Sequence, residues 1–134
     1  MPTLLPCGPV IGKTYIQSGA GAALQYHIMK LSAVSTAAVA GANDPCLGVL
    51  KNTPADGGQA SLVTRGETEV AVDAATAIVA GDYIVANASG RGIKIPATAA
   101  LKSNVLGRAM EALASGTGTI IVDVLPIVIT NPAA

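Results

Sequence analysis

LGVLKNTPADGGQASLVTR (residues 47–65) and LGRAMEALASGTGTIIVDVL (residues 106–125) share one pattern. Each segment begins with Leu-Gly, and the two Leu-Gly pairs lie 59 residues apart. Each predicts a strand, a glycine-containing turn and a second strand, because runs of Val, Ile and Leu flank a Gly-rich cluster. The repeat therefore predicts two β-hairpins of one kind. At the same spacing, the further matches are Ala55 with Ala114, Gly57 with Gly116, and Val63 with Val122.

Apolar and polar residues alternate with a period of two elsewhere in the chain, which is typical of half-buried strands. Thr68, Val70 and Val72 fall on one side of such a run. Residues 119–125 are apolar on both sides except for Asp123, which predicts a central strand, covered on both faces and ended by Pro126. We therefore predict an all-β fold, a single small β-barrel or sandwich. Further strands are predicted at residues 13–18, 24–29, 34–39, 80–85 and 92–95. Segment 73–80 is predicted as a tight loop or a single helical turn, and segment 96–104 as a loop that can include a helical turn.

Three parts are predicted along the chain: an extended N-terminal arm (residues 1–12), an all-β domain (residues 13–130) and a tail (residues 131–134). The prolines of the arm remove backbone donors and favour extended chain, so the arm is not an internal strand. Its other residues are largely apolar, and we expect them to lie against their own domain or against a neighbour. The prolines of the arm are Pro2, Pro6 and Pro9.

The composition limits the core and favours assembly. The 134 residues are enough for one domain, with 51% hydrophobic residues, 12% charged residues, and neither Phe nor Trp. The core must be built from Val, Ile, Leu and Ala, each of which buries little area. So apolar a chain favours contact with other copies or with another protein, and a closed monomer with a surface of small residues is the alternative.

The charges and cysteines exclude several classes of partner. The net charge is zero and the basic residues are scattered, so no basic stripe can follow a phosphate backbone, and we expect no direct nucleic-acid binding. No apolar run is long and unbroken enough to cross a membrane. Cys7 and Cys46 lack a Cys-x-x-Cys spacing. We expect two thiols in a protein made in the cytoplasm and not exported, and a disulfide stays open.

Candidate catalytic residues are sparse. His27 is the only histidine and can supply neither a metal cluster nor a triad, so an exposed or locally hydrogen-bonded side chain is expected. Glu67 and Glu69 share one strand face without a basic or nucleophilic partner, which favours a solvated face. Asp82 follows Gly81, where a turn role suffices. We therefore predict no catalytic residue, no cofactor, no metal ligand and no enzymatic activity.

A larger set of short pieces resembles the bacteriophage capsid cement, or decoration, proteins of the small β-barrel type. The pieces occur in one order, with the rhythm of glycine, strand, turn, strand, Ala-Gly-Asp and strand, and together they span roughly 80 residues. They are Leu47-Gly-Val-Leu50, Ala55-Asp-Gly-Gly58, Val63-Thr-Arg-Gly-Glu67, Ala80-Gly-Asp-Tyr-Ile-Val85, Leu106-Gly-Arg-Ala109 and Gly118-Thr-Ile-Ile-Val-Asp-Val-Leu125.

The resemblance implies a structural protein of the virion that binds the outer surface of the expanded head. Such proteins sit as homotrimers at three-fold positions, bridge neighbouring major capsid proteins and stabilise the shell. The region before Cys46 matches nothing in the family pattern, so the resemblance does not locate the capsid contact. The arm fits a segment that reaches the capsid or an adjacent subunit, with the candidate contact residues Leu4, Leu5, Pro6, Pro9, Val10 and Ile11.

Two other functions fit the same composition. One is a β module of a phage tail or fibre, or a host shell protein, which would have no affinity for heads. The other is a small trimeric nucleotide hydrolase that resembles the dUTPase type at Ala88-Ser-Gly-Arg-Gly92 and Asp82-Tyr83. The order and spacing of those two motifs do not fit that family.

Overall fold

The computed structural model describes residues 14–96 and 102–130, and every regular element in those two ranges is a β-strand. The predicted all-β class is confirmed. The predicted arm (residues 1–12) and tail (residues 131–134) lie outside the described residues, and the described part of the domain begins at Thr14. The strands are β1 (Thr14–Gln17), β2 (Ile28–Ala33), β3 (Thr36–Val39), β4 (Gly48–Leu50), β5 (Gln59–Val63), β6 (Gly66–Ala74), β7 (Tyr83–Ala86), β8 (Gly92–Lys94), β9 (Lys102–Ala109) and β10 (Gly116–Thr130).

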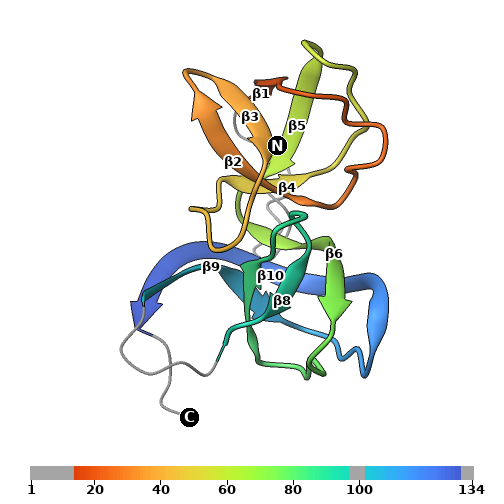
Figure 1. The fold of residues 1–134 in the computed structure, drawn as a ribbon, viewed down its shortest axis with the longest axis vertical. Helices are drawn as coiled ribbons and strands as arrows, with labels where there is room; N and C mark the ends of the chain where they lie inside the picture. Colours follow the sequence, from red (N-terminus) through yellow and green to blue (C-terminus); the bar gives the residue numbers. More distant parts are fainter. Residues whose placement is uncertain (1–13, 97–101, 131–134) are drawn as a thin grey trace, which may run out of the picture.

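The strands close into two small barrels, where the sequence had indicated one. The first barrel has the order β1-β3-β2-β4-β5 and the second has the order β10-β6-β8-β7-β9. The first lies above the second in Figure 1, and the chain passes between them once, from β5 into β6. Closing each sheet on itself leaves few free strand edges, which suits a chain with so few charges.

The two barrels repeat one topology. In each, the first and third strands pair in parallel and every other neighbouring pair is antiparallel. The registers match as well. Gln17 pairs with Ala37 in the first barrel, and the residues 55 positions later, Val72 and Gly92, pair in the second. Tyr15 and Ala60 pair in the first barrel, and they correspond to the pair Val70 and Ile120, which lie 55 and 60 positions later.

The repeated Leu-Gly pair marks the closest approach of two strands in each barrel. A Cβ atom on Gly48 would lie 2.5 Å from the backbone oxygen of Val63, and one on Gly107 would lie 2.0 Å from that of Asp123. Only glycine fits at either position. Val63 thus corresponds to Asp123 rather than to Val122, because the second hairpin is one residue longer.

Two of the predicted elements are wrong. Residues 24–27 form turns and β2 begins only at Ile28, because Tyr26 has a φ of 68°, which breaks extended chain. Tyr26 instead accepts a hydrogen bond from the backbone N–H of Ala71 in the second barrel. The segment 96–104, predicted as a loop, includes the first residues of β9, which begins at Lys102 and pairs with Thr130. Segment 73–80, where a helical turn was one alternative, instead contains Ile78, which forms an isolated β-bridge with Leu113.

Pro126 does not end the last strand, which runs on to Thr130. The register of β10 against β9 shifts between Val124, which pairs with Gly107, and Ile127, which pairs with Val105. β10 therefore advances three residues over a stretch where β9 advances two. Such a bulge leaves a residue unpaired, and proline is tolerated there because it has no N–H to satisfy. β10 is central in its sheet, as predicted, but only one of its faces is covered: Val122 is buried whereas Asp123 and Leu125 are exposed.

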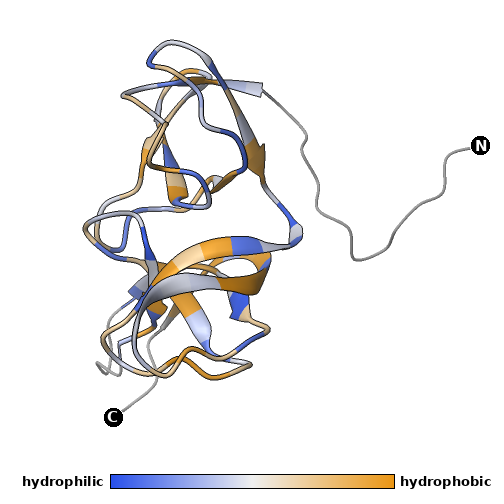
Figure 2. Ribbon diagram, turned by 90° about the vertical axis from the view of Figure 1, so that its right-hand side faces the viewer, coloured by the Kyte–Doolittle hydropathy of each residue, from blue (hydrophilic) through white to orange (hydrophobic). Residues whose placement is uncertain are grey.

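The largest hydrophobic cluster crosses from one barrel to the other. Ile28, Ala40 and Val49 of the first barrel pack with buried residues of the second. Hydrophobic residues follow the strands of both barrels in Figure 2. A separate cluster of Met29, Leu50 and others fills the first barrel. The side chains that the second barrel contributes to the shared cluster are Val70, Val72, Ala74, Ile78, Ile84, Ala86, Leu106, Ala109, Ile120, Val122 and Val124.

Among the buried polar side chains of the described residues, Gln17 has an atom without a hydrogen-bond partner. It is 1% exposed, and its Oε1 atom has no hydrogen-bond partner among the described residues. The equivalent residue of the second barrel is the apolar Val72. We expect Gln17→Leu to raise the free energy of unfolding by about 1 kcal/mol, since an unsatisfied buried carbonyl is removed. Urea denaturation checks this, and a loss of stability of that size would contradict it.

Candidate interaction surface

Tyr26 links the two barrels from the loop before β2. Its backbone N–H donates to Leu50 within the first barrel, and its carbonyl accepts from Ala71 on β6. The Nζ atom of Lys51 lies 5.5 Å from the centroid of the Tyr26 ring. The charge of the Glu69 carboxylate, then desolvation and a hydrogen bond to that carboxylate, raise the pKa of Tyr26. The charged and aromatic groups at this point therefore connect β6 to the first barrel.

Asn43 makes a second link between the barrels. It adopts a φ of 55°, which asparagine tolerates better than most residues. Its Oδ1 accepts from the backbone N–H of Asn104 at 2.9 Å, and its Nδ2 donates to the carbonyl of Lys102 at 3.2 Å. The side chain thus occupies the edge of β9 as a neighbouring strand would. The sequence indicated only a loop at residues 41–45, and an asparagine within a Gly-Ala-Asn-Asp-Pro run was the signal for it.

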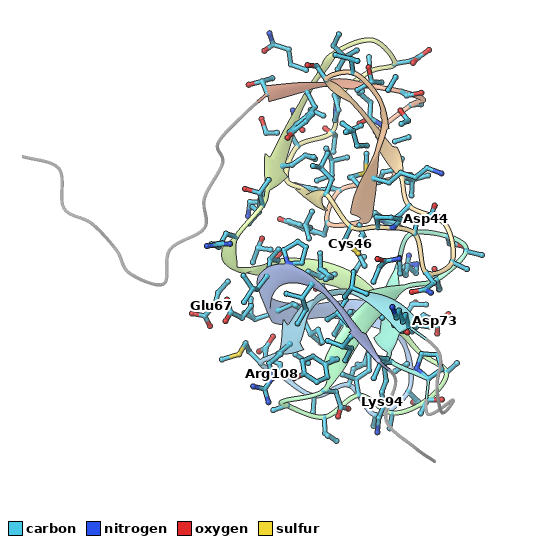
Figure 3. The ribbon with its side chains drawn as sticks, turned by 90° about the vertical axis from the view of Figure 1, so that its left-hand side faces the viewer. Asp44, Cys46, Glu67, Asp73, Lys94 and Arg108 are labelled. Carbon is cyan, nitrogen blue, oxygen red and sulfur yellow. The ribbon has the colours of Figure 1, made fainter. Side chains whose placement is uncertain are left out.

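Cys46 lies between the barrels, as Figure 3 shows, and packs against the shared cluster. It forms no disulfide with a described residue, and Cys7 lies outside the described residues, so two separate thiols stay a prediction. Its Sγ atom lies 3.7 Å from the carbonyl oxygen of Asp44 and 3.8 Å from that of Asn104. Burial, with a smaller contribution from the charge of Asp44, raises the pKa of the Cys46 thiol to about 12.

Cys46 is therefore expected to be unreactive in the folded protein. In a Cys7→Ser variant at pH 8, its reaction with Ellman's reagent should be about a thousandfold slower than in 8 M urea, because little thiolate is present. The control is the same variant in urea, where the thiol is fully exposed. Equal rates in the two conditions would show that Cys46 is readily exposed in the folded protein.

The residues considered for catalysis are not brought together. His27 is 7% exposed, and its Nδ1 lies 3.2 Å from the carbonyl oxygen of Gln25, so of the two predicted alternatives it is the locally hydrogen-bonded one. Asp82 accepts from the backbone N–H of Val79 at 2.9 Å and lies 3.8 Å from Lys94, which confirms its turn role. Among the described residues no cluster of three or more His, Cys, Asp or Glu side chains could hold a metal ion.

Charged side chains form a row across the outer face of the second barrel. Glu67 on β6 pairs with Asp123 on β10, Asp123 pairs with Arg108 on β9, and Arg108 pairs with Tyr83 on β7. The guanidinium carbon of Arg108 lies 5.4 Å from the Tyr83 ring centroid. Figure 3 shows Glu67 and Arg108 on the same side of the barrel. Glu67 and Glu69 thus lie on a solvated face, as predicted. The carboxylates of Glu67 and Asp123 are directly opposed, which is unfavourable for the pair.

Besides Val79 and Met110, the exposed large apolar side chains of the described residues fall on two parts of the fold. Ile16, Leu31 and Val34 lie on β1 and the β2–β3 hairpin of the first barrel, and Val34 is 90% exposed. The other group follows the end of β10 and consists of Leu125, Ile127 and Val128. Apolar surface of this kind on a soluble domain is typical of contact with another protein.

An apolar cavity of about 330 Å³ lies where the loop of Asn43 meets β7 and β8. Two of its polar side chains are bonded elsewhere: the Asn87 side chain accepts from the backbone N–H groups of Ser89 and Arg91, and Asn43 is bonded to β9. The rest of the lining is mostly apolar, with Lys102 and Ser103 as its other polar residues. Within the described residues no helix is long and apolar enough to cross a membrane.

The arrangement offers several surfaces for contact: a pair of barrels with a shared cluster, a row of charged side chains and two apolar groups. No curated protein matches the chain. The sequence pattern of the family described as phage cement protein matches residues 16–124, from β1 to the middle of β10. The match covers strands of both barrels, including the region before Cys46 that had no counterpart in the expected pattern. The chain belongs to the phage cement protein family.

Proposed function

We propose that this cement protein binds the outer surface of the expanded head and bridges neighbouring major capsid proteins as a homotrimer. The observation that supports this function is the presence of two exposed apolar groups on a barrel pair with a shared core. A pair of barrels with a shared cluster and two separate apolar groups can contact two shell subunits at once. The protein would be made in the host cytoplasm and would act without catalysis, cofactor or metal.

Residues 1–11 supply further contact in this proposal, through the apolar side chains and prolines of the arm. We expect deletion of residues 1–11 to weaken binding to heads by about tenfold or more, since each buried aliphatic side chain contributes on the order of 1 kcal/mol. The fold should persist, because both barrels close without these residues. Circular dichroism of the deleted chain provides the control for folding.

Co-sedimentation with heads tests the function directly. Purified chain is mixed with expanded and with unexpanded heads that lack their decoration protein. Saturable binding to expanded heads alone is expected, because only the expanded lattice would present the bridged sites. Absence of binding to either form would reject the outer-surface role, and undiminished binding of the deleted chain would reject the role of the arm.

A further inference from the structure

The end of β10 is an open strand edge. Its pairing with β6 stops at Val124, opposite Gly66, whereas its pairing with β9 continues to Thr130. No residue of β6 pairs with β10 beyond Val124, and Arg65, which directly precedes Gly66, forms a separate bridge. Both sheets close into barrels, and the end of β10 extends beyond the closed part of its sheet. It escaped prediction because Pro126 was taken as the end of the strand.

The bonds of Asn43 show which backbone groups the edge presents. Asn104 donates its N–H to Asn43, and Lys102 accepts from Asn43, so both of these β9 residues direct their backbone groups away from β10. Their partners across the ladder are Val128 and Thr130. In an antiparallel pair the partners of such residues also point outward. The N–H and C=O groups of Val128 and Thr130 therefore face the open side of β10.

The open edge is apolar as well as unpaired. Leu125–Thr130 contains no charged residue, and Val128 is 63% exposed. A shallow groove of about 200 Å³ runs beside it, lined in part by Pro45, Pro126 and Ile127. Natural proteins protect an edge of this kind with charges, with proline or with a covering segment. The far edge of the same ribbon is covered by Asn43, so an occupant is expected on this one.

We propose that residues 3–7 of a second copy of the chain add to this edge as an extra strand, an inference that rests on the homotrimer of the proposed function. Thirteen residues precede β1, and in extended form they reach about 45 Å, roughly the width of a domain of this length. Residues 1–12 contain no charged side chain, which matches the uncharged edge.

The spacing of the prolines fits an added strand. Successive residues of a strand direct their N–H groups to opposite sides, so Pro2 and Pro6 fall on one side together with Leu4. Thr3, Leu5 and Cys7 then direct their N–H groups to the other side. An edge strand needs donors on only one side, and proline is tolerated on its free side. Pro9 has the opposite parity and ends the paired stretch.

A head-to-tail contact of this kind joins different surfaces of neighbouring copies. The arm leaves the first barrel, and the open edge belongs to the second. Repetition of such a contact closes into a ring when the rotation between copies allows it, and three copies give the proposed trimer. Each copy then covers the apolar edge of the next.

The parity of the arm gives a matched pair of substitutions in the full chain. Leu5→Pro removes a donor directed at the edge, whereas Leu4→Pro places a third proline on the free side. Self-association is measured by sedimentation velocity, in solution and for chain released from heads after cross-linking. Wild type and Leu4→Pro are expected to form the same oligomer. Leu5→Pro should lower the association constant about tenfold, because an inward N–H is lost and a ring is placed against the edge.

A second measurement reads the edge itself. Hydrogen exchange at the amides of Val128 and Thr130 is expected to be slow in the assembled protein and fast in the Leu5→Pro variant. Val128→Pro should abolish assembly and leave the barrels folded, since this N–H is not used within the fold. Val128→Thr, which keeps the N–H, is its control.

Equal association of the Leu4→Pro and Leu5→Pro variants would overturn the inference. So would fast hydrogen exchange at Val128 in the assembled protein, or slow exchange at Val128 in a monomer. A Val128→Pro variant that loses head binding while its oligomer is unchanged would also contradict it. Those results would place the arm elsewhere, on its own chain or on the shell. Failure of the wild-type chain to bind heads would instead reject the proposed function, and the sedimentation of the variants would still decide the arm contact.

Discussion

Replacing Gly107 with alanine is expected to lower the free energy of unfolding by about 3 kcal/mol or more, or to prevent folding. The added Cβ would lie 2.0 Å from the backbone oxygen of Asp123 and 3.0 Å from the Cα of Val124. Both contacts are with backbone, so no side chain can rotate to relieve them. In most strands the same change is favourable, because alanine loses less entropy than glycine on folding.

Gly118→Ala is the matched control, because a Cβ there would lie no closer than 3.5 Å to its nearest neighbour, the side chain of Leu113. Its stability should stay within about 0.5 kcal/mol of wild type. Gly48→Ala, with its clash against Val63, should resemble Gly107→Ala. Urea denaturation of the three variants separates these expectations. A Gly107→Ala variant as stable as the control would show that β9 and β10 lie further apart than the structure places them.

Replacing Ile28 with alanine is expected to destabilise both barrels together. Ile28 is fully buried in the cluster that the barrels share, and its backbone N–H donates to the carbonyl of Gly90 in the second barrel. Truncating a buried isoleucine costs about 2–5 kcal/mol, from lost burial and the cavity that remains. Because the cluster is continuous, we expect one unfolding transition at lower denaturant, with the slope against urea unchanged.

The control for Ile28→Ala is Val34→Ala, since Val34 is 90% exposed and should contribute less than about 0.5 kcal/mol. Two probes follow the transition: tyrosine fluorescence, and the reactivity of Cys46 between the barrels. Coincident curves are expected for wild type and for both variants. Separate transitions for the two probes, or a variant in which only the first barrel unfolds, would show that the barrels are independent units.

The sequence predicted the elements that depend on local pattern. The hairpins around Pro54-Ala-Asp-Gly-Gly58 and before Gly118 are present, and Thr68, Val70 and Val72 are buried on one side of β6, as the alternation indicates. These features follow from glycine-rich turns and period-two patterning, which act over a few residues. The repeated Leu-Gly pair was also visible in the sequence, and its cause is the contact between strands at Gly48 and Gly107.

The features that prediction missed depend on contacts far apart in the chain. Tyr26 lies in a pattern that suits a strand, but bonds to Leu50 and Ala71 hold it in a left-handed conformation instead. Pro126 is compatible with a strand only because a bulge places it where no donor is needed. The division into two barrels follows from parallel pairing of β1 with β3 and of β6 with β8, which no local pattern encodes.

The candidate contact residues show the same limit. Leu4, Leu5, Pro6, Pro9, Val10 and Ile11 were chosen from composition alone and lie outside the described residues, so their role stays a prediction. The open edge of β10 and the side chain of Asn43 that covers the opposite edge could be found only once the pairing of β9 and β10 was known.

The common register of the two barrels bears on the origin of the molecule. The pair Gln17–Ala37 is repeated 55 positions later as the pair Val72–Gly92. Tandem duplication of one five-stranded unit leaves such a repeat behind. The shared cluster then joins the two repeated units, with most of its side chains supplied by the second. The two units differ in the proposed assembly: the arm precedes the first barrel, and the edge of β10 belongs to the second. A chain with two different contact surfaces has a direction, so that copies of it can be joined head to tail.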